Sequence, residues 1–390
     1  MKALTWQGKR QVEYREVPDP RIEEPTDAIV RITSTAICGS DLHLYELLGP
    51  YMHQGDVLGH EAMGIVEEVG SEVTELSVGD RVVIPFNIAC GDCWMCRRGL
   101  QSQCETTQVR KFDKGAALFG YSELYGQVAG GQAEYLRVPH AQYGAIKVGQ
   151  ELPDHRYLFL SDILPTAWQG VEYANVPDGG TLAVFGLGPV GQLAARIGAH
   201  LGHEVIAVDP VPERRAMASR HGIKTMDFSK HTVGQLREMT GRGPDAVLDT
   251  VGMEAHGSPG ASLLQSAVGL LPDPVAQKAM ETMSVDRTVV LHSAISAVRR
   301  GGTISLSGVY SGAATPMPLL EMFDKQIQLR QGQCNVKNWT EQLLPFTEDS
   351  ADPLGLDDLV THQVSLEEGP KMYETFQKKE DQCIKVVMTP

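Results

Sequence analysis

The stretch TLAVFGLGPVG, residues 181–191, decides the fold of the second half of this 390-residue chain. Its first five residues are typical of a short buried strand, and a helix-like run, residues 192–201, follows it. The three glycines have the G-x-G-x-x-G spacing, which provides a tight turn, close approach to a pyrophosphate and close helix packing. Five residues are therefore predicted to bind a dinucleotide at a helix N-terminus: Gly186, Gly188, Pro189, Val190 and Gly191.

An acidic residue, Asp209, follows the next predicted strand, residues 204–208. At this distance from the glycine turn, an acid binds the hydroxyls of the adenosine ribose and repels a 2′-phosphate, which favours NAD over NADP. Pro210 comes next, where an NADP-binding protein often has a basic residue. The alternative is that Asp209 only closes a turn after the strand. Arg214 either covers the adenine face or is solvated.

From about residue 164 the pattern alternates between strands and helices, which is typical of a parallel sheet. Six segments are predicted strands: 181–186, 204–208, 223–227, 245–249, 303–307 and 326–330. They predict a doubly wound α/β domain over residues 164–332. One segment, residues 253–290, is longer than loops in compact domains usually are. We interpret it as an insertion that covers the cofactor, contacts a second subunit or forms a surface loop.

Residues 1–163 contain short strands between Gly/Pro turns, such as 28–32, 64–69 and 81–85. This pattern predicts an all-β barrel or sandwich. Residues 333–390 return to a mixed character, and we expect them to pack on the first part.

Four cysteines form a C-x2-C-x2-C-x7-C cluster in the stretch NIACGDCWMCRRGLQSQC: Cys90, Cys93, Cys96 and Cys104. Four thiolates so close together suit one tetrahedral Zn²⁺. The layout does not suit a disulfide scaffold in a chain of this length. The alternatives are an iron–sulfur cluster and thiols without metal. Because a four-thiolate zinc has no open position, we predict a structural zinc lobe, about residues 88–106, that does not catalyse.

The composition is typical of an enzyme with two cores, since 42% of the residues are hydrophobic. The formal net charge of −15 argues against nucleic acid and anionic membrane surfaces as partners. The first residues, MKALTWQGKRQVEY, lack the apolar region of a signal peptide. No apolar run approaches the roughly 20 residues that span a bilayer. Together with the metal-type cysteine spacing, this predicts a cytoplasmic location.

Three further clusters supply a thiolate, an imidazole and carboxylates. They are CGSDLH at residues 38–43, GHE at residues 59–61, and Asp162 within LSDILPT. Each is unremarkable alone, because a single Cys or His is usually structural. Together they contain enough groups for three zinc ligands with one coordination position left open. Such a zinc is a Lewis acid that binds an alcohol oxygen, lowers its pKa and stabilises the alkoxide.

The chain resembles the zinc-dependent medium-chain dehydrogenase/reductase family over essentially its whole length. The resemblance rests on CGSDLH, GHEAMGIVEEVG, the four-cysteine lobe, VFGLGPVGQ and THQVSLEEGPKMYETF. Within the family the chain is most similar to the glutathione-independent formaldehyde dehydrogenases, through LSDILPT, VDPVPERR, VGMEAHG, RQGQCNVK and KEDQCIKVVMTP. The resemblance implies a GroES-like β-rich catalytic domain, residues 1–163 with 333–390, and an NAD-binding Rossmann domain, residues 164–332.

The resemblance also implies roles for single residues around a catalytic zinc. Cys38 and His60 match the first two zinc ligands, and Asp162 lies where many alcohol dehydrogenases have a second cysteine. Glu61 matches a nearby carboxylate that approaches the metal. Asp41 matches an acid that orients His60.

Ser40 and His43 match a proton relay that runs from the zinc-bound oxygen, through the nicotinamide ribose, to solvent. The alternatives are that Ser40 and Asp41 cap a helix and that His43 is only structural. His256 and Val309 are two further predicted cofactor contacts.

These features predict a zinc- and NAD-dependent dehydrogenase that oxidises a small alcohol or a hydrated aldehyde such as formaldehyde, by hydride transfer from a zinc-bound alkoxide. The expected cofactors are NAD and two zinc ions per subunit, one catalytic and one structural. The resemblance suggests a homotetramer, with a dimer second. The nearest alternative is the same chemistry on a polyol, threonine or a simple primary alcohol. A remoter alternative is a non-catalytic zinc-binding protein with a relic cofactor fold.

Overall fold

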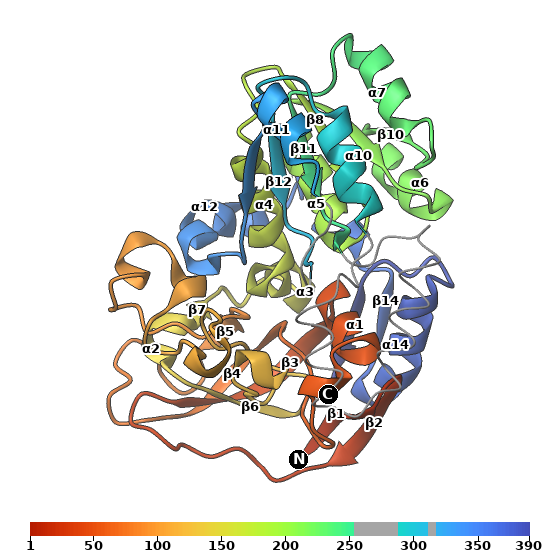
Figure 1. Ribbon diagram of the computed structural model, residues 1–390. Helices are drawn as coiled ribbons and strands as arrows, with labels where there is room; N and C mark the ends of the chain where they lie inside the picture. Colours follow the sequence, from red (N-terminus) through yellow and green to blue (C-terminus); the bar gives the residue numbers. More distant parts are fainter. Residues whose placement is uncertain (253–287, 311–316) are drawn as a thin grey trace. The chain divides into compact units, whose positions relative to one another are not determined.

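The computed structural model describes residues 1–252, 288–310 and 317–390. These residues form two compact units, one of Met1–Pro165 with Cys334–Pro390 and one of Thr166–Gln333 (Figure 1). Most of the predicted insertion, together with the predicted cofactor contact His256, lies outside the described residues.

The second unit contains a six-stranded parallel sheet in the order β10-β9-β8-β11-β12-β13. Its strands are β8 (Thr181–Phe185), β9 (Glu204–Val208), β10 (Lys224–Met226), β11 (Ala246–Asp249), β12 (Thr303–Leu306) and β13 (Gln328–Gln331). After β10 the chain returns to place β11 on the other side of β8, as in doubly wound folds. The predicted α/β fold is therefore confirmed, and all six predicted strands are present with small differences at their ends.

Helices cover this sheet, and α5 packs on β8 and β9 while α10 packs on β11 (Figure 1). The helices are α4 (Ile163–Ala174), α5 (Pro189–His200), α6 (Pro212–Arg220), α7 (Thr232–Thr240), α10 (Val289–Ala297) and α11 (Leu319–Lys325). Helix α5 begins earlier than the predicted run, at Pro189. Proline suits this place because its fixed φ is helical and the first turn does not need its missing N–H. All residues of β11 and β12 are buried, as expected for parallel strands covered on both faces.

The first unit contains a seven-stranded sheet in the order β14-β15-β3-β4-β5-β7, with β6 pairing with β3, and a separate ribbon of β1 and β2. The strands are β1 (Lys2–Gly8), β2 (Gln11–Glu16), β3 (Ala28–Ile37), β4 (Ala62–Val69), β5 (Arg81–Ile84), β6 (Tyr135–Val138), β7 (Ile146–Lys147), β14 (His362–Ser365) and β15 (Val386–Thr389). The predicted β-rich character is confirmed. The long strand β3 pairs antiparallel with β4, β6 and β15, so the C-terminal segment joins the sheet of the N-terminal one.

Short helices connect these strands. The α-helices are α1 (Gly39–Glu46), α2 (Ala141–Gly144), α3 (Asp154–Leu158), α12 (Val336–Glu348), α13 (Leu356–Leu359) and α14 (Gly369–Lys378). The 3-10 helices are Gly49–Tyr51, Cys96–Arg98, Gln101–Gln103, Arg110–Phe112, Glu123–Tyr125, Phe159–Ser161 and Leu366–Glu368. Within the part of the chain that the structure describes, none of the helices combines the length and the apolar character needed to cross a bilayer.

Candidate functional site

The four cysteines of the four-cysteine lobe come together as one group. The sulfur atoms of Cys90, Cys93, Cys96 and Cys104 all lie within 4.8 Å of one another, and Cys93 Sγ is 3.9 Å from Cys104 Sγ. Four sulfurs at about 2.3 Å from one zinc ion in a tetrahedron would be separated by about 3.8 Å. The arrangement therefore fits the predicted zinc ion.

Backbone N–H groups of the same loop donate to these sulfurs. Cys90 N donates to Cys104 Sγ (3.4 Å), and Glu105 N donates to Cys93 Sγ (3.4 Å). Burial alone would raise the pKa of Cys104, but the donors from Cys90 and Thr107 outweigh it and lower this pKa to about 6. The loop thus favours a thiolate, the form that binds metal, at Cys104, whereas burial raises the pKa of Cys96.

A second group, which we call the buried cluster, consists of Cys38, His60, Glu61 and Asp162. All four residues are buried, and one ligand atom from each lies within 4.8 Å of the others. His60 Nε2 is 3.1 Å from Asp162 Oδ2, and Cys38 Sγ is 3.5 Å from the same oxygen. The three chain segments arrive from the start of α1, the start of β4 and the end of a 3-10 helix. The structure therefore brings together all the predicted ligands.

The electrostatics of the buried cluster favour a cation. Burial alone would lower the pKa of His60, but the charge of Asp41 and the hydrogen bond with Asp162 outweigh it and raise this pKa well above its usual range. Burial raises the pKa of Cys38 and of Glu61. Buried acidic groups are stable in their charged form only with a compensating positive charge, and a metal ion would add to the one that Lys385 supplies to Glu61. Sulfur, nitrogen and oxygen are the donors that zinc accepts, so the buried cluster fits a zinc ion.

Helix α1 carries three of the residues predicted to support this cluster. Asp41 Oδ1 lies 2.9 Å from His60 Nδ1, and Asp41 Oδ2 accepts a hydrogen bond from the backbone N–H of Cys38 before the helix (2.9 Å). Asp41 thus faces the imidazole and also caps the helix, so the two interpretations of this residue are compatible. Ser40 Oγ lies 3.8 Å from Cys38 Sγ, and His43 is buried in the same helix. A relay through Ser40 and His43 stays a prediction.

Lys385 also belongs to this site, although the sequence does not predict it there. It is fully buried, its Nζ pairs with Glu61 Oε2, and it also donates to the carbonyl oxygen of Ile37 (3.2 Å). Burial alone would lower the pKa of Lys385, but the charge of Glu61 outweighs it and raises this pKa. The signal available in the sequence was that Lys385 interrupts the apolar run CIKVVM.

The glycine turn of the second unit has the geometry that its sequence predicts. Gly186 has φ +92°, in the region that favours glycine. A Cβ atom at Gly191 would lie 1.9 Å from the carbonyl oxygen of Gly186, so a side chain does not fit there. A Cβ atom at Gly188 would meet no described atom within 4 Å, which leaves space for the close approach of a ligand.

Asp209 lies directly against this turn. Its Oδ2 accepts a hydrogen bond from the backbone N–H of Leu187 (2.7 Å), and its Oδ1 accepts one from Val211 (2.7 Å). Arg214 Nη1 is 3.9 Å from Asp209 Oδ2, whereas Val309 lies partly exposed in the loop after β12. The structure thus places Asp209 and Arg214 beside the turn, and the contacts of all three residues with NAD stay predictions.

A glycine-rich dinucleotide turn in one unit and two zinc-type ligand sets in the other define the class, a zinc-binding dehydrogenase. Residues 24–150 match the model of the alcohol dehydrogenase GroES-like domain, and residues 189–267 match the model of the zinc-binding dehydrogenase. The chain is 42% identical to an uncharacterized zinc-type alcohol dehydrogenase-like protein, AdhB of Bacillus subtilis, with all of both chains covered.

Two further proteins are similar to this chain over nearly its whole length. The first is a glutathione-independent formaldehyde dehydrogenase of Pseudomonas aeruginosa, which is 32% identical over 96% of this chain and 94% of its own length. The second is the alcohol dehydrogenase TADH from Thermus sp. ATN1, whose structure matches with a TM-score of 0.81, 33% identity and coverage of 100% and 99%. The chain therefore belongs to the zinc-dependent medium-chain alcohol dehydrogenase family. Membership supports zinc-dependent alcohol oxidation as the reaction class.

Proposed function

We propose that the chain oxidises a small alcohol or a hydrated aldehyde of the formaldehyde type, with NAD as the hydride acceptor. The observation that carries the proposal is the buried cluster, which places a cysteine sulfur, an imidazole and two carboxyl groups within 4.8 Å of one another. The similarity to a formaldehyde dehydrogenase supports the substrate class. A hydrated aldehyde has hydroxyl groups on a carbon that bears hydrogen. It therefore donates hydride as an alcohol does, and no thiol nucleophile is needed.

We assign Cys38, His60 and Asp162 as ligands of the catalytic zinc and the four-cysteine lobe as the holder of the structural zinc. When bound, the catalytic zinc supplies a Lewis acid for the substrate oxygen, and NAD supplies the hydride acceptor. Asp162 instead of a cysteine leaves the formal charge of the ligands unchanged but offers a harder donor atom. In this proposal the first unit is catalytic, and the second unit binds NAD through the glycine turn and Asp209.

The chain's own groups then move the proton of the substrate hydroxyl. Ser40 accepts this proton and at the same time gives up its own, because a hydroxyl both donates and accepts hydrogen bonds. His43 passes the proton on, because imidazole titrates near neutral pH. Ser40 and His43 are three residues apart on α1 and so lie on the same side of the helix.

A substrate panel tests the proposal. With NAD in excess, we expect the highest kcat/KM for formaldehyde and small primary alcohols, and lower values for a polyol and for threonine. A value at least tenfold higher for threonine or a polyol would disprove the proposed substrate class but not the zinc chemistry. Activity with none of them, in protein that contains two zinc ions per chain and binds NAD, would contradict the whole proposal.

A pair of substitutions at Asp162 tests the ligand assignment. Asp162→Cys keeps a negatively charged ligand, so we expect two zinc ions per chain and a measurable residual activity. Asp162→Ala removes the ligand, so we expect zinc only in the four-cysteine lobe and no activity. Metal analysis gives the zinc content per chain of both variants and of the wild type. Equal zinc content in Asp162→Ala and the wild type would exclude Asp162 as a ligand.

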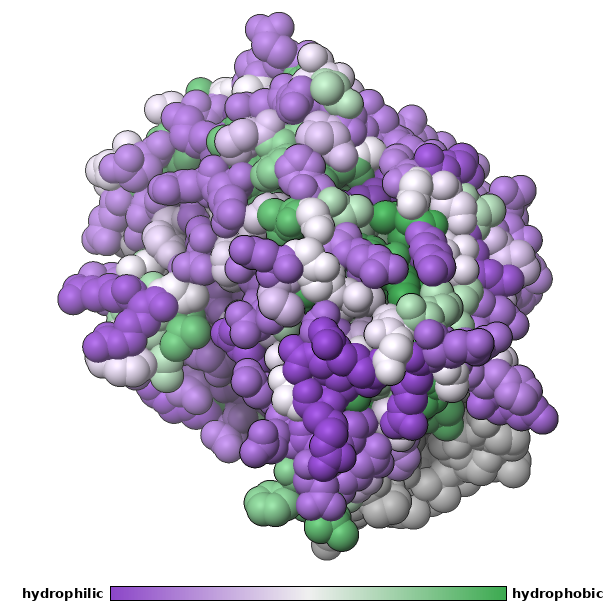
Figure 2. Space-filling view, turned by 90° about the horizontal axis from the view of Figure 1, so that it is seen from above, coloured by the Kyte–Doolittle hydropathy of each residue, from purple (hydrophilic) through white to green (hydrophobic). Residues whose placement is uncertain are grey.

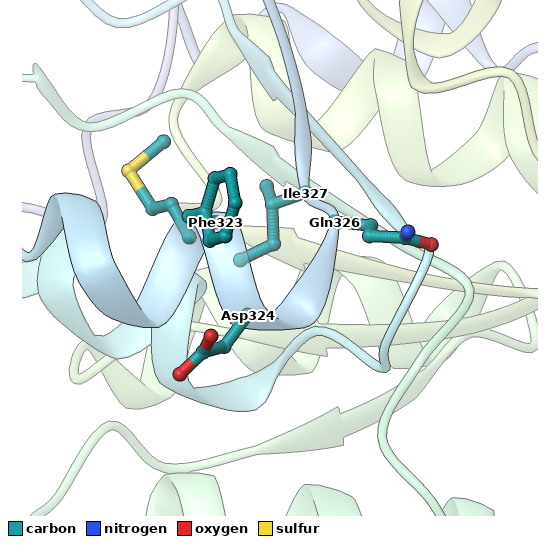
Figure 3. Close-up of a pocket in the computed structure, with 5 residues that line it drawn as sticks. Phe323, Asp324, Gln326 and Ile327 are labelled. Carbon is teal, nitrogen blue, oxygen red and sulfur yellow. The ribbon is translucent and has the colours of Figure 1, made fainter.

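We also propose a cytoplasmic homo-oligomer, in which β13 meets the β13 of a second copy. All four residues of β13 are exposed, and no other described strand pairs with its outer edge. Helix α11 adds a patch of three large apolar residues, Leu319, Leu320 and Phe323, that are 66%, 74% and 79% exposed. A pocket of about 520 Å³ lies at this helix, where Figure 3 shows Phe323 beside Ile327.

A second copy suits this surface better than a different protein. Under a two-fold axis, the two identical edges satisfy each other's backbone groups. β13 has no Pro, and its one charged residue, Arg330, lies over the ring of Tyr173 (4.0 Å to the centroid), so little protects a free edge. Much of the surface seen in Figure 2 is hydrophilic, with apolar residues gathered in small patches. Light scattering should show a dimer or tetramer for the wild type and smaller species for Leu320→Asp, and a monomeric wild type would contradict the proposal.

A further inference from the structure

A buried row of side chains leads from helix α14 to the buried cluster. Tyr373 Oη donates to Gln132 Oε1 (2.8 Å), and Gln132 Nε2 donates to Asp41 Oδ2 at 3.4 Å. Asp41 Oδ1 in turn lies 2.9 Å from His60 Nδ1. All four side chains are buried, and Gln132 and Tyr373 have no exposed surface. Neither Gln132 nor Tyr373 was predicted as part of the site.

The acceptors around Gln132 determine the direction of its amide. Gln132 Nε2 also donates to the carbonyl oxygen of Ala36 (3.0 Å). A carbonyl and a carboxylate only accept hydrogen bonds, so the NH₂ group has to face Ala36 and Asp41. The amide oxygen then faces the Tyr373 hydroxyl, which donates. Each polar atom of this amide has a partner, and the flipped amide would place its oxygen against two acceptors.

The backbone of Gln132 holds the loop that carries His60. Gln132 N donates to the carbonyl oxygen of Leu58 (2.9 Å). Gly59 has φ +97°, and a Cβ atom there would lie 2.3 Å from the side chain of Gln132. Gln132 therefore packs against the residue before His60, while its amide contacts Asp41, which faces the imidazole.

We propose that Gln132 is a positioning residue for the metal ligand His60, and that Tyr373 holds Gln132 in its one productive orientation. The amide fixes the carboxylate of Asp41, and the carboxylate fixes the ring of His60 so that Nε2 points to the other ligands of the buried cluster. The proposal rests on the zinc site of the proposed function. It adds Gln132 and Tyr373 to that site. Both residues are proposed to slow the release of the metal.

The test is the release of zinc to a chelator, followed separately for the two sites. Gln132→Glu keeps the shape but replaces the donor by an acceptor beside Asp41 and Ala36. We expect zinc to leave the buried cluster about tenfold faster, as for other outer partners of metal ligands, while the four-cysteine lobe releases zinc at the wild-type rate. In protein loaded with Co²⁺, we expect a shifted visible absorption from the buried cluster alone.

Tyr373→Phe removes only the hydroxyl, and we expect a smaller acceleration in the same direction. Tyr157→Phe is the matched control, because Tyr157 is another buried tyrosine of this unit whose ring lies 5.1 Å from the Arg81 guanidinium and outside the row. This control should leave both zinc sites unchanged. If Gln132→Glu does not fold, Tyr373→Phe decides the question.

The four-cysteine lobe serves as an internal reference for the outcome. Faster release from both sites together would show a general loss of stability and would overturn the proposal, as would an unchanged rate from the buried cluster. A wild-type protein with zinc only in the lobe would overturn the proposed function as well. The readout needs no substrate, so an error in the proposed substrate class does not affect it.

Discussion

The four-cysteine lobe and the buried cluster each gather four metal-binding side chains, but they are built in different ways. The lobe takes its ligands from one short stretch, residues 90–104, and hydrogen bonds of the same loop support them. The buried cluster takes its proposed ligands from three separate segments, at residues 38, 60 and 162, with Glu61 beside them. Its imidazole and one carboxylate are supported by side chains from elsewhere, above all Asp41 and Lys385.

The origin of the ligands in each site agrees with the role that we propose for that site. Four identical ligands on one loop close the coordination sphere of zinc, and such a site can only hold structure. In the proposed function, the three ligands of the buried cluster leave a position for substrate, and their geometry depends on outer partners. Each of the following variants should therefore affect one of the two sites and spare the other.

The largest effect is expected for Cys104→Ser in the lobe. A structural zinc contributes about 10 kcal/mol of binding free energy, which is also folding free energy. We expect the variant to lose the lobe zinc and to give little folded protein, measured by metal analysis and thermal unfolding. Cys334→Ser, at another buried cysteine of the same unit, is the control and should keep both zinc ions. A Cys104→Ser protein with two zinc ions per chain would refute the structural role.

The next effect is expected for His60→Ala in the buried cluster. Loss of a catalytic metal removes several kcal/mol of transition-state stabilisation, so kcat/KM should fall by about 10³-fold or more. The lobe should keep its zinc. Steady-state kinetics and metal analysis test both statements, with His155→Ala as a control, since His155 pairs with Asp357 away from the cluster. Activity near the wild-type value in His60→Ala would exclude a catalytic zinc at this place.

The third variant is Lys385→Met. Expressed as a free energy, its expected effect is similar to that of His60→Ala or slightly smaller. The substitution leaves the buried carboxylate of Glu61 without its cation, which should lower the free energy of unfolding by about 3–5 kcal/mol. Denaturant unfolding measures the change. The double variant Lys385→Met/Glu61→Gln removes both charges and should recover a large part of the loss. If the double variant is no more stable than Lys385→Met, the ion pair is not the cause.

The smallest effect is expected for Asp41→Asn, which weakens the acceptor beside His60 Nδ1. The affinity of the buried cluster for zinc should fall by about 10–100-fold, because outer partners of metal ligands act on that scale. Competition with a chelator measures this affinity. Asp92→Asn is the control at the lobe, since that carboxylate is exposed and pairs only with Arg97 among the described ion pairs. An equal loss of zinc from both sites in Asp41→Asn would contradict the separation of the two clusters.

Much of the fold could be predicted because the signals were local. The strand, glycine turn and helix of residues 181–200 lie next to one another in the sequence, and each glycine has a steric reason visible in the motif itself. The lobe is equally local. The largest difference is at β3, which continues from the predicted end at residue 32 to Ile37, whereas β4 begins two residues before its predicted start. The polar residues 33–35 look like a turn in the sequence, but pairing with β4 and β15 keeps them in the strand.

The rest of the site could not be predicted because its contacts cross the chain. Lys385 meets Glu61 over 324 residues, and Tyr373 meets Gln132 over 241 residues. A lysine or a glutamine has no feature in the sequence that distinguishes a buried partner of a ligand from a solvated side chain. Only the tertiary structure brings these residues to the ligands, and the pairing of β15 with β3 does so for Lys385, which directly precedes β15.

The contact between Lys385 and Glu61 also has a consequence for the order in which the enzyme is made. A ribosome adds about 5–20 residues per second, so the 324 residues between the two partners take roughly 16–65 s. The four cysteines of the lobe, Asp162 and the entire second unit emerge during that interval. Until Lys385 and β15 have been made, the carboxylate of Glu61 has no cation to pair with, and β3 cannot pair with β15. Newly made chains therefore pass through a stage in which the lobe can be complete and the active site cannot.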